Sequence, residues 1–94
     1  MPINAIQINV GSYYYAGTNC EQLRKVTKIV KDDKGRNRIV YESKSAKIAK
    51  RQFVPTATLA NPALEATFAS DCCSELSASE IQKLRQKNII LANE

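Results

Sequence analysis

The 94-residue chain contains no histidine and no tryptophan. The absence of histidine excludes Ser-His and Cys-His nucleophile activation, histidine-based metal sites and the most common general base. The three glycines are too far apart in the sequence to form a phosphate-binding loop, and no close acid pair suggests acid–base catalysis. We therefore expect a protein that is not an enzyme and that holds no cofactor.

Cysteine is also scarce, and Cys20, Cys72 and Cys73 form neither a CxxC pair nor a zinc-ligand spacing, so we expect no metal site. The adjacent pair Cys72-Cys73 has two interpretations. It could oxidise to a strained ring that is easily reduced. Alternatively, one thiol is buried as a small hydrophobic group and its neighbour lies at the surface. No cationic cluster adjoins the pair to lower a thiol pKa, which favours the second interpretation.

Long apolar runs are absent as well, and none approaches the roughly 18 to 20 residues that span a bilayer. The N-terminal stretch "MPINAIQINV" lacks the basic region of a signal peptide. These features predict a cytoplasmic protein with no membrane partner. The length fits one domain over residues 1–94, with a strand-rich basic part at 1–60 and a helical part at 61–94.

The first half of the chain has the signals of β-strands. "INAIQINV" alternates apolar and polar residues, and "SYYYA" is rich in strand-favouring aromatics. "LRKVTKIVKDDKGRNRIVYESKS" predicts a β-hairpin whose turn contains Gly35 at a position of positive φ. "AKIAKRQFV", closed by Pro55, and "TATLA" are candidate third and fourth strands after "SYYYA".

The second half has the signals of helices. Asn61-Pro62 is a well-formed helix start, and Leu64, Phe68 and Cys72 would line one face of that helix at i, i+4 spacing. "SASE" at 77–80 is a capping box that opens a second helix, and "NIIL" is a final strand or an apolar tail pinned to the core. We predict an α+β fold: a small, strongly curved antiparallel sheet or SH3-like barrel of about four to five strands, followed by two short helices.

Basic residues are concentrated between Arg24 and Arg51. This segment holds eleven Lys and Arg against three acids, a local balance of +8, and the rest of the chain balances −3, which together give the net charge of +5. Such a segment is typical of a surface that binds phosphates. The more common explanation of such a segment is an exposed sheet that carries charge for solubility and against edge pairing.

If the segment binds nucleic acid or an acidic protein, its cations would contact the partner and two tyrosines could stack on unpaired bases. The candidate residues are Arg24, Lys25, Lys28, Arg36, Arg38, Lys47, Lys50, Arg51, Tyr13 and Tyr15. In a strand, Tyr13 and Tyr15 share one face and Tyr14 takes the other. One face would then pack in the core, and the other would border the basic hairpin or a subunit contact, or else serve as a stacking site. The chain lacks the motifs of specific RNA-binding or helix-turn-helix domains, which favours contact with the nucleic-acid backbone.

The stretches "RKVTKIV", "GRNRIVYESKS" and "RQFVP" resemble the small SH3-like β-barrels of many short bacterial proteins, over roughly residues 11–59. In general character the chain resembles short bacterial proteins carried on mobile elements or gene cassettes. The barrel resemblance implies peptide binding, nucleic-acid binding or a ribosome-associated role, and does not choose among them.

Two functions follow from the sequence. The first is a non-enzymatic binding module that uses the basic hairpin on a nucleic-acid backbone. The second is a homo-oligomeric interaction protein without a nucleic-acid role, in which "AIQINV" and "NIIL" would be edges buried between subunits.

Overall fold

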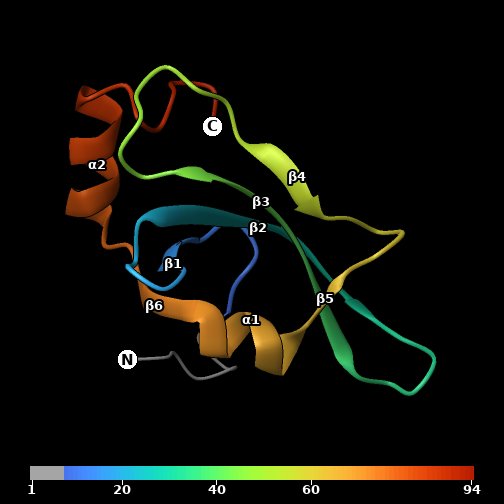
Figure 1. The fold of residues 1–94 in the computed structure, drawn as a ribbon. Helices are drawn as coiled ribbons and strands as arrows, with labels where there is room; N and C mark the ends of the chain where they lie inside the picture. Colours follow the sequence, from blue (N-terminus) through green and yellow to red (C-terminus); the bar gives the residue numbers. More distant parts are fainter. Residues whose placement is uncertain (1–7) are drawn as a thin grey trace.

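The computed structural model describes residues 8–94, which form six strands and two helices (Figure 1). The strands are β1 (Tyr13–Ala16), β2 (Gln22–Lys31), β3 (Asn37–Ser45), β4 (Val54–Ala57), β5 (Ala63–Leu64) and β6 (Cys72–Glu75). The helices are α1 (Glu65–Asp71) and α2 (Ala78–Gln86).

The strands form one antiparallel sheet in the order β4-β3-β2-β1-β6, and β5 pairs with β3 outside this path. Within residues 8–94 no pairing joins β4 to β6, so the sheet stays open. The predicted α+β class is therefore confirmed, whereas a closed SH3-like barrel is not.

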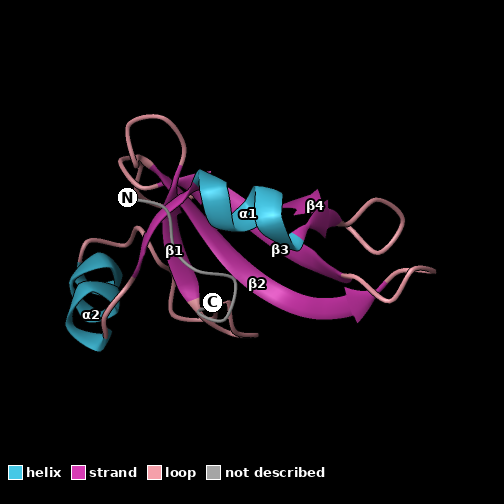
Figure 2. Ribbon diagram, turned by 90° about the horizontal axis from the view of Figure 1, so that it is seen from below, coloured by secondary structure: helices cyan, strands magenta, loops and turns pink. Residues whose placement is uncertain are grey.

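The long β2–β3 hairpin forms as its sequence predicts, and the strand order places it in the middle of the sheet. Gly35 adopts φ +75° in the turn, a conformation that glycine reaches without steric cost. The register shifts between Val26 and Lys28, which marks a bulge in β2 ahead of the regular pairing of Ile29 with Ile39. Figure 2 shows β2 as a long curved strand, which agrees with the predicted curvature.

Each face of the sheet carries its own hydrophobic cluster, because side chains alternate along the strands. Tyr14 is fully buried on one face and meets Phe68 of α1 with ring centroids 5.6 Å apart. Tyr13 is buried on the other face, in a cluster with Leu84 of α2 and Ile90 of the C-terminal segment. α1 and α2 therefore cover different faces, and Figure 2 shows α2 standing at one end of the sheet.

Three predictions about the middle of the chain are wrong. Residues 46–53 form a loop and not a third strand, and Pro55 lies inside β4 instead of closing a strand before it. The first helix begins at Glu65, because Asn61 forms a tight turn with Thr58 and β5 follows it.

The ends of the chain give mixed results. The capping box of Ser77 and Glu80 opens α2 as predicted. Ile89 and Ile90 are buried without forming a strand, so "NIIL" is an apolar tail pinned to the core. The predicted first strand falls largely on residues 1–7, which lie outside the described part, and residues 8–10 are not in a strand. No helix within residues 8–94 is long and apolar enough to cross a membrane.

The cysteines adopt an arrangement that the sequence did not predict. Cys72 is buried and free, in agreement with the hydrophobic interpretation, and its burial raises the pKa of its thiol to about 11. Cys73 is its neighbour on the extended strand β6 and points the other way, where it forms a disulfide with Cys20. A ring between Cys72 and Cys73 is therefore not what forms.

Candidate nucleic-acid interface

Arg24, on β2, is a predicted contact residue that the fold uses internally. Its side chain is only 11% exposed, and its guanidinium lies 4.8 Å from the centre of the Tyr41 ring. It also pairs with Asp71 at 3.7 Å and donates to the side chain of Gln22. Its charge is therefore compensated by a carboxylate from outside the basic segment.

Arg36 and Arg38, at the tip of the hairpin, are held by one carboxylate. Asp32 Oδ2 accepts from Arg36 Nε at 2.9 Å and from Arg38 Nε at 3.1 Å. Its Oδ1 accepts from the backbone N–H groups of Lys34 and Arg36. The Arg36 backbone N–H is the main cause of a pKa far below the usual range, and the two arginine side chains contribute to it. Asp32 is therefore ionised and neutralises part of the hairpin tip.

Lys25 and Lys28 lie on the face of β2 opposite to Arg24. Lys25 stands directly across from Glu42 of β3, and its Nζ lies 5.6 Å from the centre of the Tyr13 ring. Lys28 is exposed and stands across from Val40. Lys28 is thus the more available of the two cations.

The two tyrosines predicted as stacking groups belong to the core. Tyr13 is 6% exposed and meets Phe53 with ring centroids 6.0 Å apart. Tyr15 is half-buried against the same cluster. They share one face as predicted, but α2 and the C-terminal segment cover it, so the stacking role assigned to Tyr13 is a misassignment.

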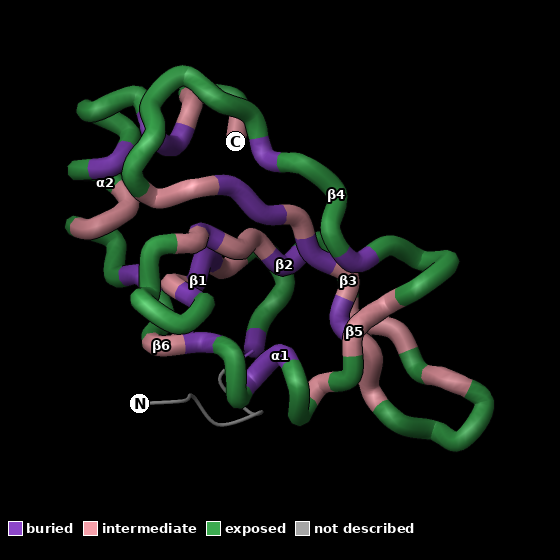
Figure 3. Tube along the Cα trace, in the orientation of Figure 1, coloured by how far each residue is buried: buried purple, intermediate pink, exposed green. Residues whose placement is uncertain are grey.

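A second basic region is formed by two segments that are distant in the sequence. Lys47, Lys50 and Arg51 lie in the exposed loop after β3, at the top of Figures 1 and 3. The Lys50 backbone N–H donates to the Asn88 carbonyl oxygen at 2.7 Å, which joins this loop to the end of α2. Three further exposed cations lie in the last turn of α2 and at its C-cap, namely Lys83, Arg85 and Lys87. We call these six cations the basic end: Lys47, Lys50, Arg51, Lys83, Arg85 and Lys87.

The carboxylates near the basic end are engaged elsewhere. The four ion pairs within residues 8–94 involve none of its six cations. Arg85 donates to the Glu94 main-chain oxygen at 2.8 Å, while the Glu94 carboxylate turns inward to Lys44. The side-chain carboxylates that form the four ion pairs of residues 8–94 therefore leave the six cations of the basic end unpaired with them.

A buried ion pair fixes the shape of this region. Lys44 Nζ lies 2.7 Å from Glu94 Oε1, with side chains 2% and 9% exposed, and also donates to the Arg51 carbonyl oxygen. Glu94 accepts further hydrogen bonds from the backbone N–H groups of Phe53 and Leu91. Burial disfavours the carboxylate, but these donors outweigh it and lower the pKa of Glu94. The pair thus ties β3, the 46–53 loop and the C-terminal segment together.

An apolar groove of about 430 Å³ runs beside β3 and β4. Val40, Pro55, Ala57 and Leu59 line it, and Glu42 adds a carboxylate. Leu59 is 61% exposed. Most of the side chains that line this groove are therefore apolar or uncharged.

The described residues form no group of three or more His, Cys, Asp and Glu that could hold a metal ion. A scan against models of protein families, a search of curated proteins and a search of solved structures find no match to this chain. The functional argument therefore depends on the geometry of the chain itself.

Counting basic residues along the sequence identified three of the six cations of the basic end. It did not show that three hairpin arginines are held in ion pairs. Lys47, Lys50 and Arg51 are among the contact residues predicted from the sequence, whereas the three α2 cations lie outside the basic segment between Arg24 and Arg51 and are not. The missing signal is the turn at Asn88, which adopts φ +58° just after α2 and meets Lys50 at φ +64°. Asn is among the non-glycine residues that adopt such a conformation most readily.

Proposed function

We propose that this protein is a non-enzymatic binding module that engages the phosphate backbone of nucleic acid through the basic end. The observation that carries the proposal is that two distant segments, each with three exposed cations outside the four ion pairs of residues 8–94, are joined by the backbone hydrogen bond from Lys50 to Asn88. Cations placed in this way neutralise phosphates and release condensed counterions, which favours binding without dependence on base sequence.

The anchoring of the basic end supports this function. The loop bends over the Lys44–Glu94 pair, and its backbone bond to Asn88 holds it against α2. Positioned cations lose less conformational freedom on binding than cations on a free segment. The hairpin, named from the sequence as the binding element, becomes a secondary surface in this proposal because three of its arginines are held in ion pairs with Asp32 and Asp71.

Fluorescence anisotropy with labelled single-stranded and double-stranded oligonucleotides across a salt series tests the proposal. We expect binding at about 50 mM salt with a log–log slope of about −3 to −5, as four to six phosphate contacts predict. Any preference between single-stranded and double-stranded oligonucleotides should come from the spacing of their phosphates and not from base stacking, because the candidate tyrosines Tyr13 and Tyr15 offer no exposed aromatic platform. Absence of binding, or binding that does not weaken with salt, contradicts the proposal. Polyglutamate serves as a second ligand, and tighter binding to it identifies an acidic protein partner instead.

A second candidate function is homo-oligomerisation through the apolar groove. Val54 and Leu59, each about 60% exposed, border or line this region, and a second copy could bury them. Pro55 removes one donor from the outer strand β4, which discourages simple edge-to-edge pairing, so side-chain packing would have to form the contact. The "NIIL" segment supplies no edge for this purpose because Ile89 and Ile90 are already buried.

Light scattering at increasing concentration tests this second function. A dimer that Leu59→Ser converts to a monomer supports it, and a monomer at all concentrations removes it. The cytoplasmic location expected from the sequence stays a prediction. The disulfide between Cys20 and Cys73 is a separate argument about location and does not depend on the binding function.

A further inference from the structure

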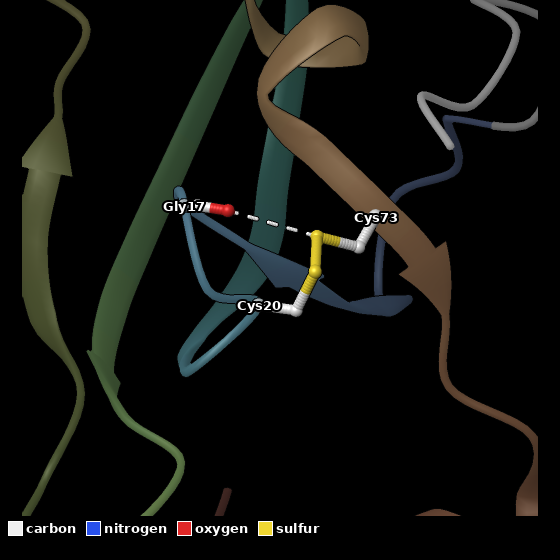
Figure 4. The surroundings of a disulfide bond; sticks show 3 residues. All are labelled: Gly17, Cys20 and Cys73. Atoms are coloured by element: carbon white, nitrogen blue, oxygen red, sulfur yellow. Dashed lines mark hydrogen bonds between the residues drawn. A yellow bond between two sulfur atoms is a disulfide. The ribbon is translucent and has the colours of Figure 1, made fainter.

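The disulfide between Cys20 and Cys73 connects two parts of the chain that are 53 residues apart in the sequence. Cys20 lies in the turn between β1 and β2, and Cys73 lies on β6 at the end of the sheet, with Cα atoms 5.9 Å apart (Figure 4). The Cys73 sulfur also lies 3.7 Å from the Gly17 carbonyl oxygen, a packing contact since a disulfide sulfur carries no proton.

The turn is shaped to present Cys20 to the strand. Cys20 adopts φ +56°, a left-handed conformation that residues with a Cβ adopt at a cost. The Cys20 N–H donates to the Gly17 carbonyl, and the Gly17 N–H donates to Asp71 just before β6. The backbone therefore brings the two cysteines together by contacts separate from the sulfur bridge.

The surroundings do not resemble those of a catalytic or sensing thiol. Glu21 adjoins Cys20, and Glu75 lies two residues from Cys73, as does Asp71, which is paired with Arg24. Neighbouring carboxylates disfavour a thiolate, whereas reactive cysteines need cations or a helix N-terminus. Cys72, the remaining thiol, is buried on the other side of β6, where its raised pKa keeps it protonated and unable to attack the bridge.

We propose that Cys20–Cys73 is a structural cross-link on which the stability of the folded chain depends, so that the protein matures and works where thiols are oxidised. In its formation, two thiols react with a disulfide oxidant such as oxidised glutathione. One sulfur–sulfur bond forms in the chain, the bond in the oxidant breaks, and two reduced glutathione molecules carry away both electrons and both protons. This inference argues against the cytoplasmic location, because a reducing cytoplasm keeps such pairs open.

The cross-link closes a long loop and holds β6, which leads directly into α2. A bridge of this span restricts the unfolded chain strongly, so its loss should lower the Tm by roughly 10 to 25 °C. The inference does not depend on the proposed function, since it concerns stability and the thiol count and not ligand binding.

The experiment produces the chain in two ways, in the reducing cytoplasm of a bacterial host and by export to its oxidising periplasm. Each product is unfolded without reductant and alkylated, and its mass is measured by mass spectrometry to count the alkylated cysteines. We expect one alkylated cysteine in the exported protein, Cys72, and a peptide map that links Cys20 to Cys73. We expect three alkylated cysteines and the lower Tm in the cytoplasmic protein. Three free thiols in the exported protein would overturn the assignment.

Matched variants separate the bridge from the buried thiol. Cys20→Ala/Cys73→Ala should show the low Tm in both preparations, with no response to added reductant. Cys72→Ala should keep a large drop of Tm on reduction, because its bridge is intact. Equal Tm values for the reduced and oxidised wild-type chain would contradict a structural role even if the bridge forms.

Discussion

The hairpin tip and the basic end are both rich in cations, but they differ in whether side-chain carboxylates pair with those cations. At the tip, Asp32 binds Arg36 and Arg38 and shapes the turn around itself. At the basic end, the side-chain carboxylate of Glu94 pairs with the buried Lys44, and the surface cations take part in none of the four ion pairs of residues 8–94. The difference shows that local charge balance depends on where carboxylates point after folding, and not only on how many stand in a segment.

The largest effect is expected when the buried carboxylate of Glu94 is removed. Glu94→Gln leaves Lys44 charged and without its anion in a site where it is 2% exposed, so unfolding free energy should fall by about 3–5 kcal/mol. Urea denaturation measures this loss. The 46–53 loop should loosen, which weakens oligonucleotide binding, while the hairpin retains its turn contacts.

A matched double variant identifies the cause of that loss. Lys44→Met/Glu94→Gln removes both charges and should recover much of the stability, because the buried ion pair is replaced by two uncharged side chains, one of them apolar. If the double variant is no more stable than Glu94→Gln, the buried charge is not the reason for the destabilisation.

The contribution of Glu94 should also depend on pH. Its pKa is lower in the folded chain than in the unfolded chain, so the folded state binds fewer protons in the acid range. The stabilisation is therefore complete above the ordinary glutamate pKa of about 4.3 and is lost as the pH falls through the lowered folded value.

Urea denaturation of wild type and Glu94→Gln at about pH 6 and about pH 3 checks this dependence. The stability difference between the two proteins should shrink in acid, and taking that difference cancels the titration of Asp32, which both share. A difference of the same size at both pH values would show that Glu94 is not responsible.

The smallest effect is expected at the hairpin tip. Asp32→Asn keeps an oxygen for the turn N–H groups but frees Arg36 and Arg38. Asp33→Asn is the matched control, since Asp33 is exposed and takes part in none of the four ion pairs of residues 8–94. If the basic end is the site, both variants should raise oligonucleotide affinity by less than about twofold at fixed salt. If Asp32→Asn alone raised oligonucleotide affinity by much more than about twofold, the result would indicate that the hairpin is the binding site.

The elements that the sequence predicted are those specified by neighbouring residues. The β2–β3 hairpin follows from two β-favouring runs around Gly35, and α2 follows from the reciprocal bonds of Ser77 and Glu80. Basic candidates such as Lys50 were found because exposed cations can be counted.

The elements that the sequence missed are fixed by distant contacts. Strand β6 forms where β1 offers it an edge, with Tyr14 and Tyr15 opposite Glu75 and Ser74, although Cys72 is predicted from the sequence to lie on the first helix. The bridge from Cys20 to Cys73 depends on that pairing. The compensation of Arg24 by Asp71 likewise needs the whole fold, so no count within Arg24–Arg51 could include it.

The most direct test of the central claim compares two triple variants with equal charge. Lys47→Gln/Lys50→Gln/Arg51→Gln alters the basic end, and Lys28→Gln/Lys31→Gln/Lys34→Gln alters the hairpin, so each lowers the net charge by three, from +5 to +2. Salt-dependent anisotropy with one oligonucleotide is the measurement. We predict that the basic-end variant loses about two to three units of salt slope while the hairpin variant loses less than about one. Equal losses, or the larger loss in the hairpin variant, would contradict the account.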